Sequence, residues 1–159
     1  MATAGRRKLH FDRFDQVRSD VDALVGAIEA GRALKTAGKW SLAQICSHLA
    51  TAFACSVDGY PGTPAPWLLR ATLGRVARTS MLSFHYLPEG APLPKDFLPV
   101  PDLDLSAQRH KLFHEIDRFL QGPLTAGHPF LGPMTRPQWS VFHLVHCSHH
   151  LSFVSVASS

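Results

Sequence analysis

The stretch Trp139–Phe153, WSVFHLVHCSHHLSF, carries the pattern that decides the fold and the most unusual residue cluster of the chain. Four of the ten histidines of the sequence lie within its eight residues 143–150. At the roughly 100° turn per residue of an α-helix, His146 and His150 share one face. His143 lies on that face one turn earlier, and the aromatic residues of the stretch lie on or near the same stripe. The pattern predicts a helix whose histidine-bearing face is buried against neighbouring helices.

The rest of the sequence predicts further helices around this one. Apolar residues recur at steps of three and four, and Ser41 and Gln44 form a capping box before an apolar run. Pro66 suits the first turn of a helix. Nothing alternates at period two for long enough to predict a strand. The helices are expected at about 13–30, 41 to 55 or 57, 66–81, 106–120 and 135–154.

This order of elements predicts an all-α bundle of four or five helices in one domain spanning residues 1–159. Prolines from Pro88 to Pro101 exclude regular structure there and predict one long connection. The apolar residues of this segment are Leu93, Phe97, Leu98 and Val100, and we expect the segment to pack against the bundle or a second subunit.

Composition excludes several classes of protein. The 159 residues are 45% hydrophobic and 18% charged, which is typical of a globular protein rather than a disordered one. No apolar run reaches the roughly 18–20 residues of a membrane span, and the first residues lack the apolar core of a secretory signal. Three cysteines are too few for a disulfide framework, so we expect a cytoplasmic protein. The net charge of +4 disfavours, without excluding, a nucleic-acid partner.

The spacing of the histidines predicts a metal site. The i,i+4 pair His146 and His150 has the spacing with which two imidazoles chelate one ion. On the predicted helix that begins near residue 41, His48 follows the apolar rhythm of Ile45, Ala52 and Cys55, which places its ring on the buried face. A lone histidine there is more often a hydrogen-bonded core residue, but an inward-facing pair on another helix favours a third ligand. We therefore predict that these three histidines bind one divalent ion and that no cysteine takes part.

The predicted ligand set indicates a metal site that can bind water or substrate. Three neutral imidazoles suit zinc, nickel, copper or iron and leave a fourth position for water or substrate. His143 is either a residue that supports the ligands, a general base, or a core histidine bonded to a backbone carbonyl.

Long segments of the chain resemble a known family, the domain of unknown function 1569 (DUF1569). The resemblance extends from about Arg7 to Phe153 and is carried by the segments WSLAQICSHL (40–49), DGYP (58–61), APWL (65–68), LPK (93–95), HPFLG (128–132) and HLVHCSHHLSF (143–153). It implies a DinB/YfiT-like four-helix bundle, a fold group in which many members are metal-dependent.

The same resemblance implies a ligand set of one histidine on the second helix and a His-x3-His pair on the last. The matching positions here are His48, His146 and His150. Many relatives continue after the pair with Arg-Gly-Gln, whereas this chain continues with the segment 151–153, Leu-Ser-Phe.

Two functions of different class are consistent with the sequence. The first is a metal-dependent enzyme that acts on a small molecule, either as a hydrolase or as a thiol-cofactor transferase. A homodimer is one oligomeric state consistent with the sequence. The alternative is a non-catalytic helical bundle with a structural or incidental metal.

One charge pattern in the sequence has two interpretations. Residues 59–88 contain no acid but include Arg70, Arg75 and Arg78. They form either a solvated helix face or a rim that holds an anionic substrate or an acidic partner.

Overall fold

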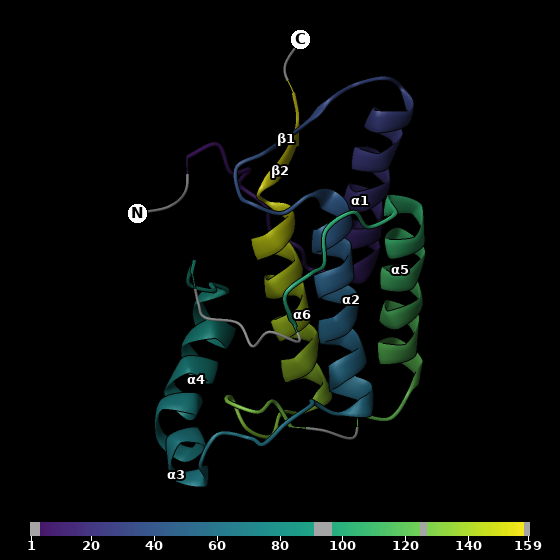
Figure 1. The fold of residues 1–159 in the computed structure, drawn as a ribbon. Coiled ribbons are helices and arrows are strands. Elements are labelled where there is room, and N and C mark those ends of the chain that lie inside the picture. Colours follow the sequence, from purple (N-terminus) through teal and green to yellow (C-terminus); the bar gives the residue numbers. More distant parts are fainter. Residues whose placement is uncertain (1–3, 91–96, 125–126, 158–159) are drawn as a thin grey trace.

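The protein is a helical bundle, which confirms the predicted fold class, and it also contains one small sheet. The computed structural model describes residues 4–90, 97–124 and 127–157. Figure 1 shows the long helices side by side and a segmented helix beside them at the lower end. The long helices are α1 (Phe14–Glu29), α2 (Leu42–Asp58), α5 (Leu105–Gln121) and α6 (Arg136–Leu151), and the segmented one comprises α3 (Trp67–Leu69), the π-helical turn η1 (Arg70–Gly74) and α4 (Arg75–Phe84).

The two helices that carry the candidate ligands begin at side-chain caps. The Ser41 hydroxyl accepts a hydrogen bond from the backbone N–H of Gln44, and the Gln44 side chain accepts one from the backbone N–H of Ser41. Thr135 and Gln138 form the same reciprocal pair at the start of α6. The predicted capping box is confirmed, and both helix starts are fixed by local sequence.

Helix α2 lies between α6 and α5 (Figure 1). It packs along α5 on one side and contacts α6 on the other. The core between these helices and α1 is built from fully buried side chains, among them Val17, Phe53, Ile116, Phe119 and Trp139. Burial of large apolar side chains of this kind is the main source of stability for a bundle. No helix within the described ranges is long and apolar enough to cross a membrane.

The prediction that the chain has no strand was wrong. Strand β1 (Leu34–Thr36) pairs antiparallel with β2 (Val154–Val156), and Lys35 lies opposite Ser155. The last helix accordingly ends at Leu151 and not at 154. A three-residue strand is too short to show a period-two pattern, so the sequence carried no usable signal for it.

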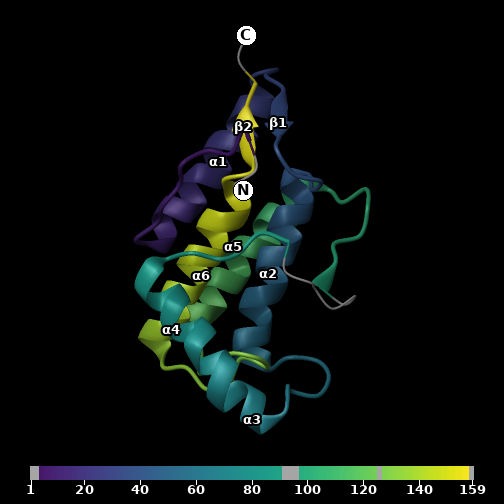
Figure 2. The same ribbon diagram turned by 90° about the vertical axis from the view of Figure 1, so that its left-hand side faces the viewer.

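The predicted helix at 66–81 is longer and less regular than expected. It runs to Phe84, its middle turn is π-helical, and Pro66 is the residue before the first turn rather than within it. In this segment, α4 packs against α6 of the bundle (Figure 2).

The proline-rich connection touches the bundle through part of its length. The Phe97 ring stacks on Tyr60 at 5.9 Å between centroids, and the Gln44 side chain donates to the Val100 carbonyl. Leu98 and Val100 are 51% and 60% exposed, so these two side chains do not pack against the bundle. Leu93 lies outside the described residues.

Candidate metal centre

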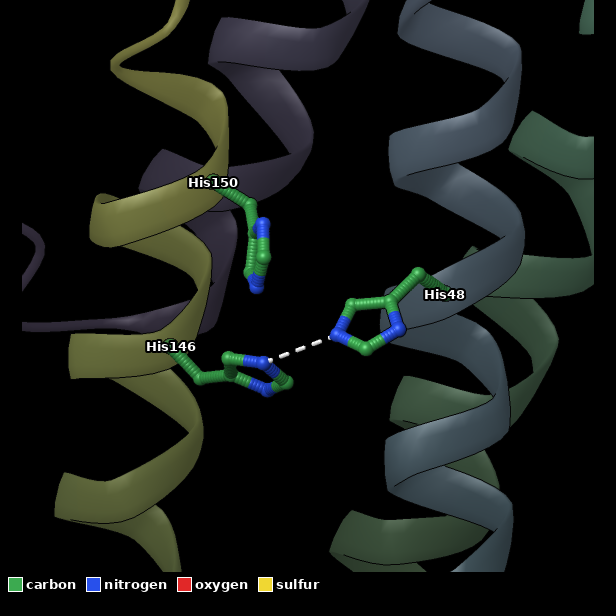
Figure 3. A group of neighbouring side chains, drawn as sticks. All are labelled: His48, His146 and His150. Carbon is green, nitrogen blue, oxygen red and sulfur yellow. Dashed lines mark hydrogen bonds between the residues drawn. The ribbon is translucent and has the colours of Figure 1, made fainter. Parts of the chain in front are cut away.

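Three histidine rings from two helices meet in the interior of the bundle. Figure 3 shows His48 on α2 facing His146 and His150 on α6. One ring nitrogen from each residue lies within 4.8 Å of the other two. His48 is buried, with 3% of its surface exposed, and the other two are half-buried. The structure therefore brings together the three residues that the sequence selects as ligands.

Local helix geometry and one aromatic ring position these side chains. His146 and His150 are four residues apart on α6, and their rings lie edge to face at 4.7 Å between centroids. The Trp40 ring stacks on His150 at 5.4 Å and lies 5.0 Å from His48. Trp40 directly precedes the capping residue of α2, so the cap of that helix also places a cover on the site.

The proton of His48 is assigned by its partner. Nδ1 of His48 lies 3.1 Å from the backbone carbonyl oxygen of Phe97. Because a carbonyl only accepts, Nδ1 must carry the proton, and Nε2 of the neutral ring is left with a lone pair. This Nε2 atom faces His146 at 3.1 Å. A ligand histidine that donates its second N–H to a backbone carbonyl is the usual arrangement at metal sites.

Electrostatics keep the three rings neutral. Burial lowers the pKa of His48, although its hydrogen bond to Phe97 acts in the opposite direction. Burial, followed by the neighbouring histidines, lowers the pKa of His146 and of His150 well below the ordinary value. Neutral imidazole is the form that binds a metal ion.

The donor set fits a divalent ion. Two nitrogen ligands at 2.0–2.1 Å from a tetrahedral ion lie about 3.3 Å apart, close to the observed 3.1 Å between the facing Nε2 atoms of His48 and His146. The Nδ1 atom of His146 is buried and has no hydrogen-bond partner among the described residues. Three histidines that close together could hold a metal ion.

No fourth ligand joins them within the described part of the chain, since the group contains neither cysteine nor carboxylate. The three cysteines are buried as free thiols. Burial raises the pKa of Cys46 to about 12 and that of Cys55 to about 11, so these thiols stay protonated at neutral pH.

His143 lies in the aromatic core. Its ring is fully buried and stacks on Phe53 at 3.9 Å between centroids. Nε2 of His143 lies 3.1 Å from the Ser56 hydroxyl, which itself donates to the Phe53 carbonyl at 2.7 Å. His143 must therefore donate through Nε2, and its buried Nδ1 has no partner among the described residues. The partner is a hydroxyl and not the backbone carbonyl considered above.

Two other histidines have defined surroundings. Nδ1 of His128 accepts hydrogen bonds from the backbone N–H groups of Phe130 and Leu131, so this ring closes the tight loop before α6. The ring of His149 contacts those of His150 and Phe153, and burial, followed by the charge of Arg6, lowers the pKa of His149 to about 4. His149 does not join the three-histidine group.

Sequence reasoning missed the residues that hold the ligands in place. The role of Trp40 could have been predicted, because this residue directly precedes the N-cap of the helix that carries His48. The Phe97 carbonyl could not, because a backbone acceptor in an irregular segment leaves no sequence signal.

Comparison with known proteins places the chain in a family. A family model described as "Protein of unknown function (DUF1569)" matches residues 3–157. The chain belongs to the DUF1569 family. The resemblance read from its motifs is thereby confirmed, and the match includes both helices of the three-histidine group. No curated protein and no solved structure matches the chain.

Proposed function

We propose that this DUF1569 protein is a metal-dependent enzyme in which His48, His146 and His150 hold one divalent ion. The observation that supports it best is the convergence of three nitrogen atoms within 4.8 Å, with no fourth side-chain ligand in the described part of the chain. Three histidines with an open fourth position are typical of catalytic rather than structural zinc sites. An all-nitrogen set suits zinc, nickel or iron.

The chain contributes neutral, oriented ligands. Burial removes the charge of the three rings, and the Phe97 carbonyl fixes the tautomer of His48. When bound, a divalent ion supplies Lewis-acid chemistry, which acidifies water or stabilises a thiolate. This chemistry favours two reactions of a small-molecule substrate: its hydrolysis, or its reaction with the thiol of a cofactor.

A second candidate is a non-catalytic bundle with a structural metal. It is supported by the position of the site between α2 and α6, where an ion would join two helices. A structural zinc normally has four protein ligands, whereas three are found among the described residues. The enzyme is therefore the stronger proposal.

Metal stoichiometry tests the ligand assignment. We expect about one divalent ion per chain by elemental analysis of untagged protein, and loss of most of it in His48→Ala, His146→Ala and His150→Ala. His114→Ala, an exposed histidine on α5, is the matched control. Full occupancy in folded His146→Ala and His150→Ala, with folding checked by circular dichroism, would contradict the assignment.

Activity assays separate the two functions. We expect turnover of an activated ester such as p-nitrophenyl acetate, or conjugation of glutathione to an electrophilic arene. The activity should disappear on metal removal and return on reloading. A protein that binds one ion through these histidines but turns over no member of a broad ester and thiol panel would support the structural role.

The role of His143 stays a prediction with two readings. As a general base it would affect turnover but not metal content. As a residue that positions α6 against α2 through Ser56, it would affect stability in both the loaded and the metal-free protein. His143→Gln distinguishes them when metal content, stability and the pH profile of turnover are measured together.

A further inference from the structure

A hollow of about 320 Å³ lies between the segmented helix and the loop that precedes α6. Its wall carries Arg70, Arg75 and Arg78, and Trp67 lies at its rim. None of the three ligand histidines lines it. We infer that this hollow is a binding site for the phosphate group of a small molecule, separate from the metal centre.

The charge of the hollow is not neutralised by the protein. No aspartate or glutamate occurs in residues 59–88. In the described part of the chain, the three arginines of the hollow take part in no ion pair with an acid. The arginines that do pair with an acid are Arg6, Arg7, Arg13, Arg18, Arg109 and Arg118.

One donor in this group is buried without an acceptor. The Nε atom of Arg70 has no hydrogen-bond partner among the described residues. Buried polar groups of folded proteins are nearly always hydrogen-bonded, and none of the described residues supplies the acceptor for this N–H. The guanidinium of Arg70, whose side chain lines the hollow, is therefore not held by an internal acceptor at Nε.

The hollow is held in place by specific contacts. Nη1 of Arg78 donates to the carbonyl of Leu131 at 3.2 Å and also to that of Pro133. The loop touches the helix backbone at Gly74, where a Cβ atom would lie 2.1 Å from the Phe130 carbonyl oxygen. Gly74 ends the π-helical turn that begins at Arg70. Single π-helical turns occur frequently at functional sites.

The chemistry of the lining selects the ligand. Guanidinium groups bind oxyanions through paired N–H donors, and three of them match the double charge of a phosphate better than a single carboxylate. Trp67 is 72% exposed and offers a flat apolar surface for the body of the ligand. The volume lies at the lower end of the roughly 300–1,000 Å³ of small-molecule sites.

Phenyl phosphate is a suitable probe because it combines a phosphate with a ring. The protein is freed of metal with a chelator, transferred to chelator-free buffer without phosphate or sulfate, and titrated by calorimetry at constant ionic strength. We expect saturable binding of one molecule per chain. Binding should weaken at least about tenfold in Arg70→Gln and in Arg75→Gln, since each removes a charge-assisted hydrogen bond.

The matched control is Arg32→Gln, which removes the same charge at an exposed position outside the hollow. It should leave the affinity unchanged. Equal weakening in Arg32→Gln would show a general charge effect and overturn the proposal, as would the absence of saturable binding to a wild-type protein that is folded by circular dichroism.

Two further ligands identify the recognised group. Inorganic phosphate should compete with phenyl phosphate, and benzoate should bind at least tenfold more weakly. Benzoate binding as tightly as phenyl phosphate would overturn the assignment to phosphate. Because the titrations use metal-free protein, their failure would leave the metal-site proposal unaffected, and loss of the metal site would leave these results unchanged.

Discussion

Fixed partners assign the protons of the buried His48 and His143 and of the half-buried His128. The Phe97 carbonyl accepts a hydrogen bond from Nδ1–H of His48, and the Ser56 hydroxyl accepts one from Nε2–H of His143. Nδ1 of His128 accepts hydrogen bonds from two backbone N–H groups, so the proton of its neutral ring lies on Nε2. Only at His48 does this assignment leave a lone pair facing the other histidines of the candidate metal centre. The tautomer, and not the residue type alone, therefore separates a candidate ligand from a core histidine.

The first prediction at this scale concerns acid stability and His143. Burial, and then the charge of His128, lowers the pKa of His143 to about 3, against about 6.5 for histidine in an unfolded chain. Between these values the unfolded chain binds a proton that the folded protein does not, so the free energy of unfolding falls as the pH drops below about 6.5. The contribution is complete above that pH and is lost by up to about 1.4 kcal/mol per pH unit below it.

Urea unfolding of metal-free protein at pH 7.5 and pH 5 measures this effect. His143→Gln, whose side chain does not titrate, should lose about 1–2 kcal/mol less than the wild type between the two values. His110→Gln, at an exposed position on α5, is the control. An identical loss in wild type and His143→Gln would show that this ring is not buried in its neutral form.

The π-helical turn is the irregular feature that matters most among the elements. It lets the segmented helix approach the loop before α6 so closely that only glycine fits at position 74. This contact, together with the hydrogen bonds of Arg78, fixes the loop that is closed by His128. The loop leads directly into α6, so its position bears on the helix that carries two of the candidate ligands.

A pair of glycine substitutions tests this contact. Gly74→Ala should destabilise the protein by about 1–3 kcal/mol, because the new Cβ atom collides with the Phe130 carbonyl and the loop must move. Gly26→Ala in α1 should stabilise it by about 0.5–1 kcal/mol, because no atom lies within 4 Å of the added Cβ and alanine favours the helix. Chemical denaturation of both variants measures the difference. A stabilising Gly74→Ala would show that loop and helix are not in contact there.

Helix α6 shows what local sequence can predict and what it cannot. Its start was predicted to within a residue, and the shared face of His146 and His150 follows from helical periodicity alone. Its end was misplaced, because Val154–Val156 leaves the helix to pair with Leu34–Thr36, more than a hundred residues earlier. The pairing depends on two distant segments, and neither segment carries a pattern of its own.

The same distinction holds for the candidate site. His48 was predictable because its helix face follows from neighbours three and four residues away. Its partner Phe97 was not, because that contact depends on where an irregular connection passes over α2. The charge pattern singled out Arg70, Arg75 and Arg78 but left a solvated face and an anion-holding rim open. The hollow that they line lies beside a π-helical turn that periodicity does not reveal.

On the scale of the whole molecule, the candidate metal centre connects distant parts of the chain. His48 and His146 are 98 residues apart, and α2 and α6 pack in the same core. An ion held between them would bind the folded protein more tightly than the unfolded chain, in which His48 is not held beside the pair of His146 and His150. Metal binding should therefore contribute directly to the stability of the bundle.

Thermal unfolding with and without metal tests this coupling. A divalent ion at about 100 times its Kd should stabilise the folded state by about 2.7 kcal/mol, which for a chain of this length raises the Tm by roughly 5–10 °C. His48→Ala and His150→Ala should each lose most of this shift, since each removes one of three ligands from a different helix. His114→Ala should keep it, because this exposed side chain on α5 is outside the group. An equal shift in all three variants would mean that the ion binds elsewhere, whereas a shift lost only in His150→Ala would restrict the site to α6 and remove the link between the two helices.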